Sequence, residues 1–502
     1  MKSRFWLCVT AIALFVALSL PVSLAAQEQQ QNKHQLRYKL VDLGTLGGPQ
    51  SFGDAGHGAG NINNGGTAVG VADTATPDPN YPNFNPLINA FGPEPFIFHA
   101  FASKNGAALV DLGALAGTNV SSPIRIGTNG LIVGTSANGT IDPLTGWPAT
   151  TAVLWKDGQI TDLGTLGGYE SEAFSVNSRG QIVGFSGNTV SDAYSILGLG
   201  TETRAFLWQD GMMHDLGTLG GPDAFAIGMN ENGQVIGFSY INSVSAPCTL
   251  TTGAFLWEEG KMVNLGTLGG NCTGPGAINS RGQIVGGSNL AGDTTAHAFL
   301  WEKGTLTDLG TLGGTFSGAT HLNEAGEVIG GATTAGDLAF HAFFWRHGVM
   351  TDLGTVGGND CSNAFGINSK GQVVGQSFPC NVNVVAHAFL WEHGHIIDLN
   401  DFVPPGSDLT LGDAEEINDR GEIFADASLP NGDHRAVVLI PCQYDDNGCQ
   451  GEKPSGVTQT SPVLIMQNAT ASGPSPSERV AAIRARLAHR YPYRGFGTYQ
   501  PK

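Results

Sequence analysis

The sequence predicts an all-β protein, a β-propeller of four-stranded antiparallel blades. Three observations predict this fold. Three motifs recur in a fixed order, every repeat unit contains four short apolar runs, and the chain begins with a fourth strand and ends after a third. Eight blades closed by the N-terminal strand fit the repeat count. Seven blades are the alternative if one of the two most degenerate units, the first or second, does not form a blade.

The repeat unit is defined by its motifs. The first is I-N-x-x-G-x-(I/V)-(V/I)-G, as in residues 278–286; the second is (H/R)-A-F-L-W followed by x-x-G, as in residues 204–211. The third is D-L-G-T-L-G-G, as in residues 308–314, and its copies start 44 to 69 residues apart. A period of this length is typical of a stacked or circular array.

Each unit encodes two hairpins. Residues 276–279 and 283–286 are short apolar runs joined by a turn that ends in Gly282. Residues 298–301 and 305–309 pair in the same way across a turn at Gly304. A short glycine-containing turn between such runs is a hairpin signal. The A-F-L-W run is apolar without alternation, so we expect it to be covered on both faces.

The two ends of the repeat region predict a closed ring. Eight I-N-type strands and eight A-F-type strands are present, but the chain starts with a lone fourth strand at residues 38–43 and ends after a third strand at residues 435–441. A linear solenoid does not require this arrangement, whereas a ring closed by its own first strand does. Closure also removes exposed sheet edges. The predicted propeller spans residues 37–441.

The N-terminal segment predicts export. Lys2 and Arg4 precede an apolar run over residues 5–20, and a small-x-small pattern ends at Ala25. This pattern indicates a signal peptide over residues 1–25, followed by a linker over residues 26–36. An uncleaved anchor is the alternative, although the run is short for a membrane span. We expect a secreted or extracytoplasmic protein without a transmembrane segment in the mature chain, in the periplasm, at the cell surface or outside the cell.

Charge and cysteine content narrow the possible partners. The formal net charge is −19, which argues against a nucleic-acid partner because phosphate binding favours a basic surface. Beyond Cys8, an even number of cysteines in an exported chain indicates disulfides. No zinc-ligand spacing is present, so no metal and no cofactor are expected. The predicted pairs are Cys248–Cys272, Cys361–Cys380 and Cys442–Cys449.

The ordered motifs resemble the HAF-repeat family of bacterial exported proteins, and the resemblance covers about 400 of the 502 residues. It implies an extracytoplasmic location and a repeat architecture. It implies no established activity.

Loop lengths predict which face of the ring is functional. The second connection of a unit is long at residues 71–98, 135–150, 185–203 and 238–252, whereas the first and third connections are short glycine turns. In a four-stranded blade, the second connection and the inter-blade connection lie on the same face. Because insertions into repeats collect on the binding face, we expect ligands on this long-loop face.

Recurring polar residues predict scaffold roles, and irregular ones predict a site. The strand-opening histidines, the Asp of D-L-G and the recurring tryptophans are expected to stabilise the blades. The position before the I-N hydrophobe varies instead, and its polar members are expected to form a patch near the central channel that binds a small polar or anionic ligand. These candidate binding residues are Asn61, Arg125, His321 and Glu416.

No catalytic motif is recognisable, and the adjacent Glu415 and Glu416 should point to opposite faces of a strand. The sequence therefore predicts a non-enzymatic exported scaffold that binds a ligand or an envelope component on its long-loop face. The alternatives are an extracellular carbohydrate-active hydrolase or lyase, and a structural or adhesive surface protein. Residues 442–476 are expected to form a disulfide loop and flexible linker, and residues 477–502 a basic helical tail.

Overall fold

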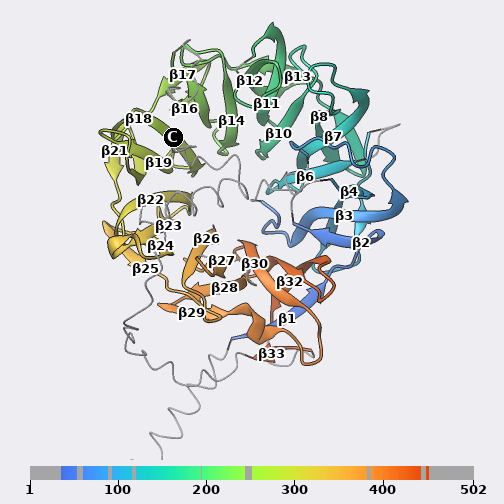
Figure 1. Ribbon diagram of the computed structural model, residues 1–502, viewed down its shortest axis with the longest axis vertical. Coiled ribbons are helices and arrows are strands. Elements are labelled where there is room, and N and C mark those ends of the chain that lie inside the picture. The colour runs from blue at the N-terminus through green and yellow to red at the C-terminus, as the bar shows by residue number, and fades with distance from the viewer. Residues whose placement is uncertain are drawn as a thin grey trace, which may run out of the picture.

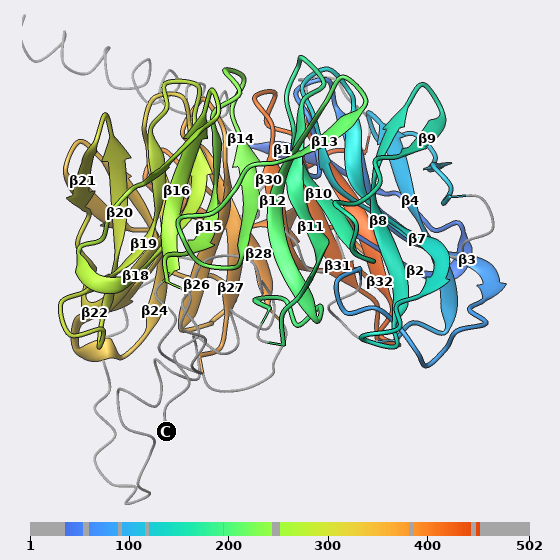
Figure 2. The ribbon, with the colours of Figure 1, turned by 90° about the horizontal axis from the view of Figure 1, so that it is seen from above.

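The computed structural model describes residues 36–53, 60–88, 93–115, 120–193, 195–242, 252–380, 386–442 and 448–451. Within these ranges the chain forms eight four-stranded antiparallel blades arranged in a ring (Figure 1). Figure 2 shows the ring on edge, with the strands running between its two faces. The predicted fold class and the count of eight blades are confirmed.

The strands follow the repeat units in chain order. Blade 1 consists of β2(Gly47–Phe52), β3(Thr67–Pro77), β4(Phe96–Lys104) and β5(Val110–Asp111), and blade 2 of β6(Ser121–Ile126), β7(Ile132–Ile141), β8(Pro148–Lys156) and β9(Gln159–Asp162). Blade 3 consists of β10(Ser171–Val176), β11(Ile182–Ser191), β12(Thr201–Gln209) and β13(Met212–Asp215), and blade 4 of β14(Ala224–Met229), β15(Val235–Tyr240), β16(Thr252–Glu258) and β17(Lys261–Asn264).

Blade 5 consists of β18(Gly269–Ile278), β19(Ile284–Leu290), β20(Ala296–Glu302) and β21(Thr305–Asp308). Blade 6 consists of β22(Gly313–Leu322), β23(Val328–Thr334), β24(Phe340–Arg346) and β25(Val349–Asp352). Blade 7 consists of β26(Cys361–Ile367), β27(Val373–Phe378), β28(His387–Glu392) and β29(His395–Asp398). Blade 8 consists of β30(Thr410–Ile417), β31(Ile423–Ser428), β32(His434–Pro441) and β1(Arg37–Asp42). Two short 3₁₀ helices, η1(Ala335–Asp337) and η2(Leu399–Phe402), lie between strands.

The two ends of the repeat region pair with each other. β1 runs antiparallel to β32, with Tyr38 opposite Pro441 and Asp42 opposite Val437. The first strand therefore supplies the fourth strand of the last blade, as predicted from the incomplete final unit. Figure 1 shows the blue β1 beside the orange β32.

β1 is also covered on its other edge. β33(Gln450–Gly451) pairs with Arg37 and Tyr38, so β1 lies between β32 and β33. The disulfide Cys442–Cys449 joins the two ends of the β32–β33 connection, and the Cys442 amide donates to the Arg37 carbonyl at 2.9 Å. The closing strand is thus paired on both sides.

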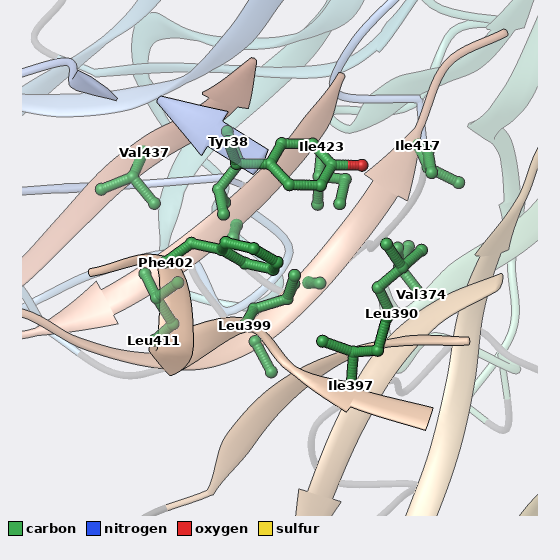
Figure 3. Close-up of a cluster of buried hydrophobic side chains, with 14 of the residues drawn as sticks. Tyr38, Val374, Leu390, Ile397, Leu399, Phe402, Leu411, Ile417, Ile423 and Val437 are labelled. Carbon is green, nitrogen blue, oxygen red and sulfur yellow. The ribbon is translucent and has the colours of Figure 1, made fainter. Parts of the chain in front are cut away.

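The side chain of Tyr38 anchors β1 in the core of blade 8 (Figure 3). Tyr38 is 2% exposed, and its ring meets Phe402 edge-on at a centroid distance of 5.1 Å. Its hydroxyl donates to the Gly421 carbonyl at 3.2 Å, which satisfies the one polar atom of the buried side chain. Ring closure therefore rests on side-chain packing as well as on backbone pairing.

The asparagine of the I-N motif connects neighbouring blades. In Asn279, Oδ1 accepts the amides of Arg281 and Gln283, and Nδ2 donates to the Asn323 carbonyl of the next blade at 3.2 Å. The same inter-blade bond runs from Asn418 to the Asn63 carbonyl at 3.0 Å, across the ring closure. We call this set the asparagine belt; its members are Asn63, Asn230, Asn279, Asn323, Asn368 and Asn418.

The recurring aspartate and histidine lie within one blade and hold its outer strands together. Asp308 accepts the Gly310 amide at 2.8 Å and also contacts Nδ1 of His297 at 2.9 Å. Arg204 replaces the histidine in blade 3 and pairs with Asp215. The predicted scaffold role of these residues is confirmed by the same contact in the pairs His99–Asp111, His297–Asp308, His341–Asp352 and His387–Asp398.

Two of the three predicted disulfides, Cys361–Cys380 and Cys442–Cys449, are present in the structure. Cys248 lies outside the described residues, so its pairing with Cys272 stays a prediction. The predicted signal peptide and basic tail also fall outside the described ranges.

Peptide mapping tests the remaining pair. We expect a non-reducing digest to yield one peptide that joins Cys248 to Cys272 and that separates on reduction, because both cysteines were assigned to the long-loop face of one repeat unit. A Cys248 cross-link to any other cysteine would contradict that assignment. The Cys361–Cys380 peptide in the same digest is the positive control.

Candidate functional site

The long second connection of blade 1 folds over blade 2. It runs from the end of β3 at Pro77 to the start of β4 at Phe96. Its Asn83 and Asn85 side chains donate to the carbonyls of Gly146 and Pro148, at 3.2 and 3.1 Å. Leu87 and Ile88 are buried apolar anchors of the same segment. The segment is therefore fixed at several points in its described part.

A pocket lies between this connection and the strands of blade 2. Its cavity has a volume of about 30 Å³, and the surrounding empty space of about 400 Å³ includes open solvent. Its walls combine carboxyl and amide groups with aromatic and aliphatic side chains. Its lining includes Asp78, Asn80, Asn83, Phe84, Glu94 and Phe98.

Two carboxyl groups line the pocket from the two ends of the blade 1 connection. The Asp78 amide donates to the Pro95 carbonyl at 3.0 Å, so Asp78 and Glu94 lie on neighbouring segments. Burial raises the pKa of Glu94 above its usual range. Burial also raises the pKa of Asp78, but the Asn80 amide, which donates to Oδ1 at 2.8 Å, opposes that rise. Glu94 is thus suited to hold a proton.

A third carboxyl group, that of Asp73, lies near Glu94. Asp73, on β3, is fully buried, and burial followed by the nearby charge of Glu94 raises its pKa to about 7. Gln50 contacts this group: its Nε2 donates to Oε2 of Glu94 at 3.4 Å, and its backbone lowers the pKa of Asp73. The nearby charge of Glu94 therefore favours the protonated form of Asp73.

Two further buried acids have structural roles. Glu170 accepts hydrogen bonds from Asn85 and Thr150, and Asp223 accepts the amides of Ile196 and Thr203. Burial raises the pKa of Glu170 to about 7 and that of Asp223 to about 6. Each carboxyl group, at the start of its blade, holds the long connection of a preceding blade in place. Of the two, Glu170 holds a residue that lines the pocket, Asn85.

The structure brings three of the four predicted binding residues together. The Gly60 amide donates to Oε2 of Glu416 at 3.2 Å, and a Cβ on Gly60 would lie 2.7 Å from Cγ of Arg125. Asn61 is the next residue and is buried. His321 lies on β22 in blade 6, two blades from Glu416. Ligand binding by these residues stays a prediction.

Asp78, Glu94 and Asp73 are not among the site residues predicted from the sequence. The available signal was the insertion in unit 1, whose described part carries Asp78 near its start and Glu94 near its end. Their approach depends on how the insertion folds back and docks on blade 2, which residue spacing does not show.

Within the described residues, no group of three His, Cys, Asp or Glu side chains is placed to hold a metal ion. In the same part of the chain, no helix has the length and apolar character needed to cross a membrane.

No protein-family model matches the chain, and no curated protein sequence matches it. Among solved structures, the β-propeller domain of the trilobed protease from Pyrococcus furiosus matches with a TM-score of 0.42 and 11% identity, over 70% of this chain and 95% of that chain. That domain is described as having an open velcro topology.

Two larger enzymes also match. Acylaminoacyl peptidase from Pyrococcus horikoshii has a TM-score of 0.41 and 11% identity, over 75% of this chain and 59% of that chain. The sialidase from Trypanosoma rangeli has a TM-score of 0.31 and 11% identity, over 74% of this chain and 58% of that chain. This chain therefore spans about three fifths of each, and the likeness shows a propeller fold alone.

The prediction of a non-enzymatic binding scaffold is corrected. The similar solved structures are named as a peptidase, a puromycin hydrolase and a sialidase, so they do not support it, and at this similarity they bear on the fold alone. The physical reason for the error lies in blade 1. No acid–base pair is recognisable in the sequence, yet the long second connection of blade 1 places two carboxyl groups in one pocket.

Proposed function

We propose that this protein is an exported hydrolase that cleaves glycosidic bonds by carboxyl acid–base catalysis in the blade 1 pocket. The observation that carries the proposal is that Asp78 and Glu94 line one pocket and that burial raises the pKa of both. Two carboxyl groups in unequal environments are the usual catalytic set for glycoside hydrolysis. The disulfides are consistent with an extracytoplasmic location, and the proposed export agrees with the HAF-repeat resemblance.

The two pocket carboxyl groups differ in the way the reaction requires. Glu94, with its raised pKa, donates a proton to the glycosidic oxygen as the bond from that oxygen to the anomeric carbon breaks. Asp78, whose carboxylate is stabilised by the Asn80 amide, takes a proton from the water that attacks the anomeric carbon.

The lining of the pocket favours a neutral sugar. Asn80 and Asn83 offer amide groups that bind hydroxyls, and Phe84 and Phe98 offer aromatic surface. An anionic substrate would be repelled by the carboxyl groups and by the net charge of −19.

The test is hydrolysis of a panel of neutral oligosaccharides and polysaccharides by the mature protein, measured as release of new reducing ends. We expect kcat to fall by about 100-fold or more in Glu94→Gln and in Asp78→Asn. Activity should decline as pH rises through the raised pKa of Glu94, because the acid must hold its proton.

Glu302→Gln is the matched control, because Glu302 is an exposed carboxylate at the end of β20 on the opposite face of the ring. It should cleave glycans at the wild-type rate. Cleavage of no glycan on the panel, or wild-type rates in both pocket variants, would refute the assignment.

A further inference from the structure

The carboxyl group of Glu170 lies where three blades meet. Glu170 is the residue before β10 in blade 3, and it is 1% exposed. Its Oε2 accepts hydrogen bonds from Nδ2 of Asn85 at 3.1 Å, from the Thr150 amide at 2.9 Å and from the Thr150 hydroxyl at 2.7 Å. Asn85 belongs to the blade 1 connection and Thr150 to β8 of blade 2, and both line the pocket. One carboxyl oxygen of blade 3 thus joins two lining residues from different blades, an arrangement that we call the Glu170 contact.

The Glu170 contact also restrains the proposed catalytic group Asp78, which lies seven residues before Asn85 in the same connection. Asn85 is 1% exposed; its Nδ2 also donates to the Pro148 carbonyl at 3.1 Å, and its Oδ1 accepts the Leu87 amide at 2.9 Å. The connection therefore docks on blade 2 through a buried amide that Glu170 holds. Release of Asn85 would loosen the segment that carries Asp78.

Comparison of the repeat units shows that this position does not need a charge. In three units, the second residue after the Gly-Gly pair accepts a backbone amide from the preceding blade. These acceptors are Gln50, Glu170 and Asp223, and their donors are the amides of His434, Thr150 and Thr203. Since Gln50 makes the bond with a neutral amide, what the carboxyl groups of blades 3 and 4 add is the ability to bind a proton.

Ionisation of Glu170 is unfavourable while the contact is closed. Its Oε1 is buried and has no hydrogen-bond partner among the described residues. Burial raises the pKa of Glu170 to about 7, the charge of Asp142 adds to the rise, and the hydrogen bonds to Oε2 oppose it. The other carboxyl groups close by are those of Asp78 and Glu94, which line the same pocket. A solvated glutamate ionises at lower pH, so the proton stabilises the closed contact, and this stabilisation is lost as the pH rises through about 7.

We propose that Glu170 is a positioning residue of the blade 1 pocket, which keeps Asn85 and Thr150 together while it carries a proton and loosens its hold when it ionises. The inference rests on the proposed function and adds its regulation: the pocket is assembled in mildly acidic surroundings and loosens in alkaline ones. Asp223 holds the blade 3 connection in the same way. Burial raises the pKa of Asp223 to about 6, so we expect that connection to loosen at a lower pH.

Hydrogen exchange of the full mature chain, corrected for the intrinsic effect of pH on exchange, measures the contact without a substrate. We expect peptides that cover residues 78–88 and 148–152 to lose about tenfold in protection between pH 5 and pH 8.5. Glu170→Gln keeps an oxygen acceptor, as Gln50 does in blade 1, but cannot ionise, so these peptides should stay protected over the whole range. The blade 3 connection, held by Asp223, should lose protection in both proteins.

Two controls separate the Glu170 contact from general loosening and from catalysis. The Phe340 amide of blade 6 donates at 3.2 Å to Sγ of Cys361, a disulfide sulfur that does not titrate. Its peptide should therefore keep the same protection at each pH. Glu94→Gln removes the proposed acid, and residues 78–88 should show the wild-type pH dependence of exchange in this variant.

The cleavage assay gives a second measurement. KM of the wild-type chain should rise in alkaline solution and that of Glu170→Gln should not, whereas the alkaline limit that Glu94 sets on kcat should remain in both. Exchange of the wild-type chain that does not change with pH would overturn the role of Glu170, and this outcome needs no variant to fold. A pH dependence that Glu170→Gln retains would overturn it as well. Exchange that depends on Glu170, in a chain that cleaves no glycan, would overturn the proposed function and leave the Glu170 contact standing.

Discussion

A chain that lacks residues 1–43 is expected not to form a stable ring. The deletion removes β1, and with it five paired backbone positions against β32 and the buried side chains of Tyr38 and Leu43. Each fully buried side chain of this size contributes about 2–3 kcal/mol. Together with the lost backbone pairing, this loss is comparable to the whole net stability of a typical domain, about 5–15 kcal/mol. The freed edge of β32 would also invite aggregation.

The matched control is deletion of residues 1–35, which ends just before the described chain and leaves β1 intact. Thermal unfolding and size-exclusion chromatography compare the two. The shorter deletion should unfold as the mature protein does, whereas the longer one should be aggregated or lack a cooperative transition. A synthetic peptide of residues 36–46 should restore part of the transition by adding a strand in trans. If the chain that lacks residues 1–43 unfolded cooperatively at the same temperature as the chain that lacks residues 1–35, β1 would not be what closes the ring.

The architecture was predictable because the repeat fixes it. Every unit repeats the same two hairpins, so the apolar runs and glycine turns predict a blade without any knowledge of distant contacts. The closure was predictable by counting strands, since a lone fourth strand such as residues 38–43 can complete only a blade that lacks one. These inferences use local pattern and chain order alone.

The asparagine belt and the pocket were less accessible to sequence reasoning. Asn279 has the expected place in a hairpin turn, but its bond to the Asn323 carbonyl depends on how neighbouring blades approach each other. Asp78 and Glu94 are 16 residues apart, and they share a pocket only because the intervening chain docks on blade 2. Repetition predicts what all blades share, whereas the candidate site lies in the blade that departs most from the repeat.

Asn418→Ala is expected to lower the free energy of unfolding by about 2–4 kcal/mol, because the asparagine belt crosses the ring closure at this residue. Asn418 is 4% exposed; its Oδ1 accepts the amides of Arg420 and Glu422, and its Nδ2 donates to Glu422 and to the Asn63 carbonyl. Alanine leaves these partly or fully buried groups without the partners that Asn418 provides.

Chemical denaturation measures the effect, with Asn431→Ala as the control, since Asn431 is an exposed asparagine in the β31–β32 turn of the same blade. Asn431→Ala should lower the free energy of unfolding by less than about 0.5 kcal/mol. Asn279→Ala, at an interface within the continuous chain, should cost nearly as much as Asn418→Ala, because the two side chains make equivalent bonds. If Asn418→Ala instead resembled the exposed control, the belt would not hold the closing blades together. Ring closure would then depend on β1 and on the apolar contacts between blades 8 and 1, and the repeated asparagine would stabilise only the turn in which it lies.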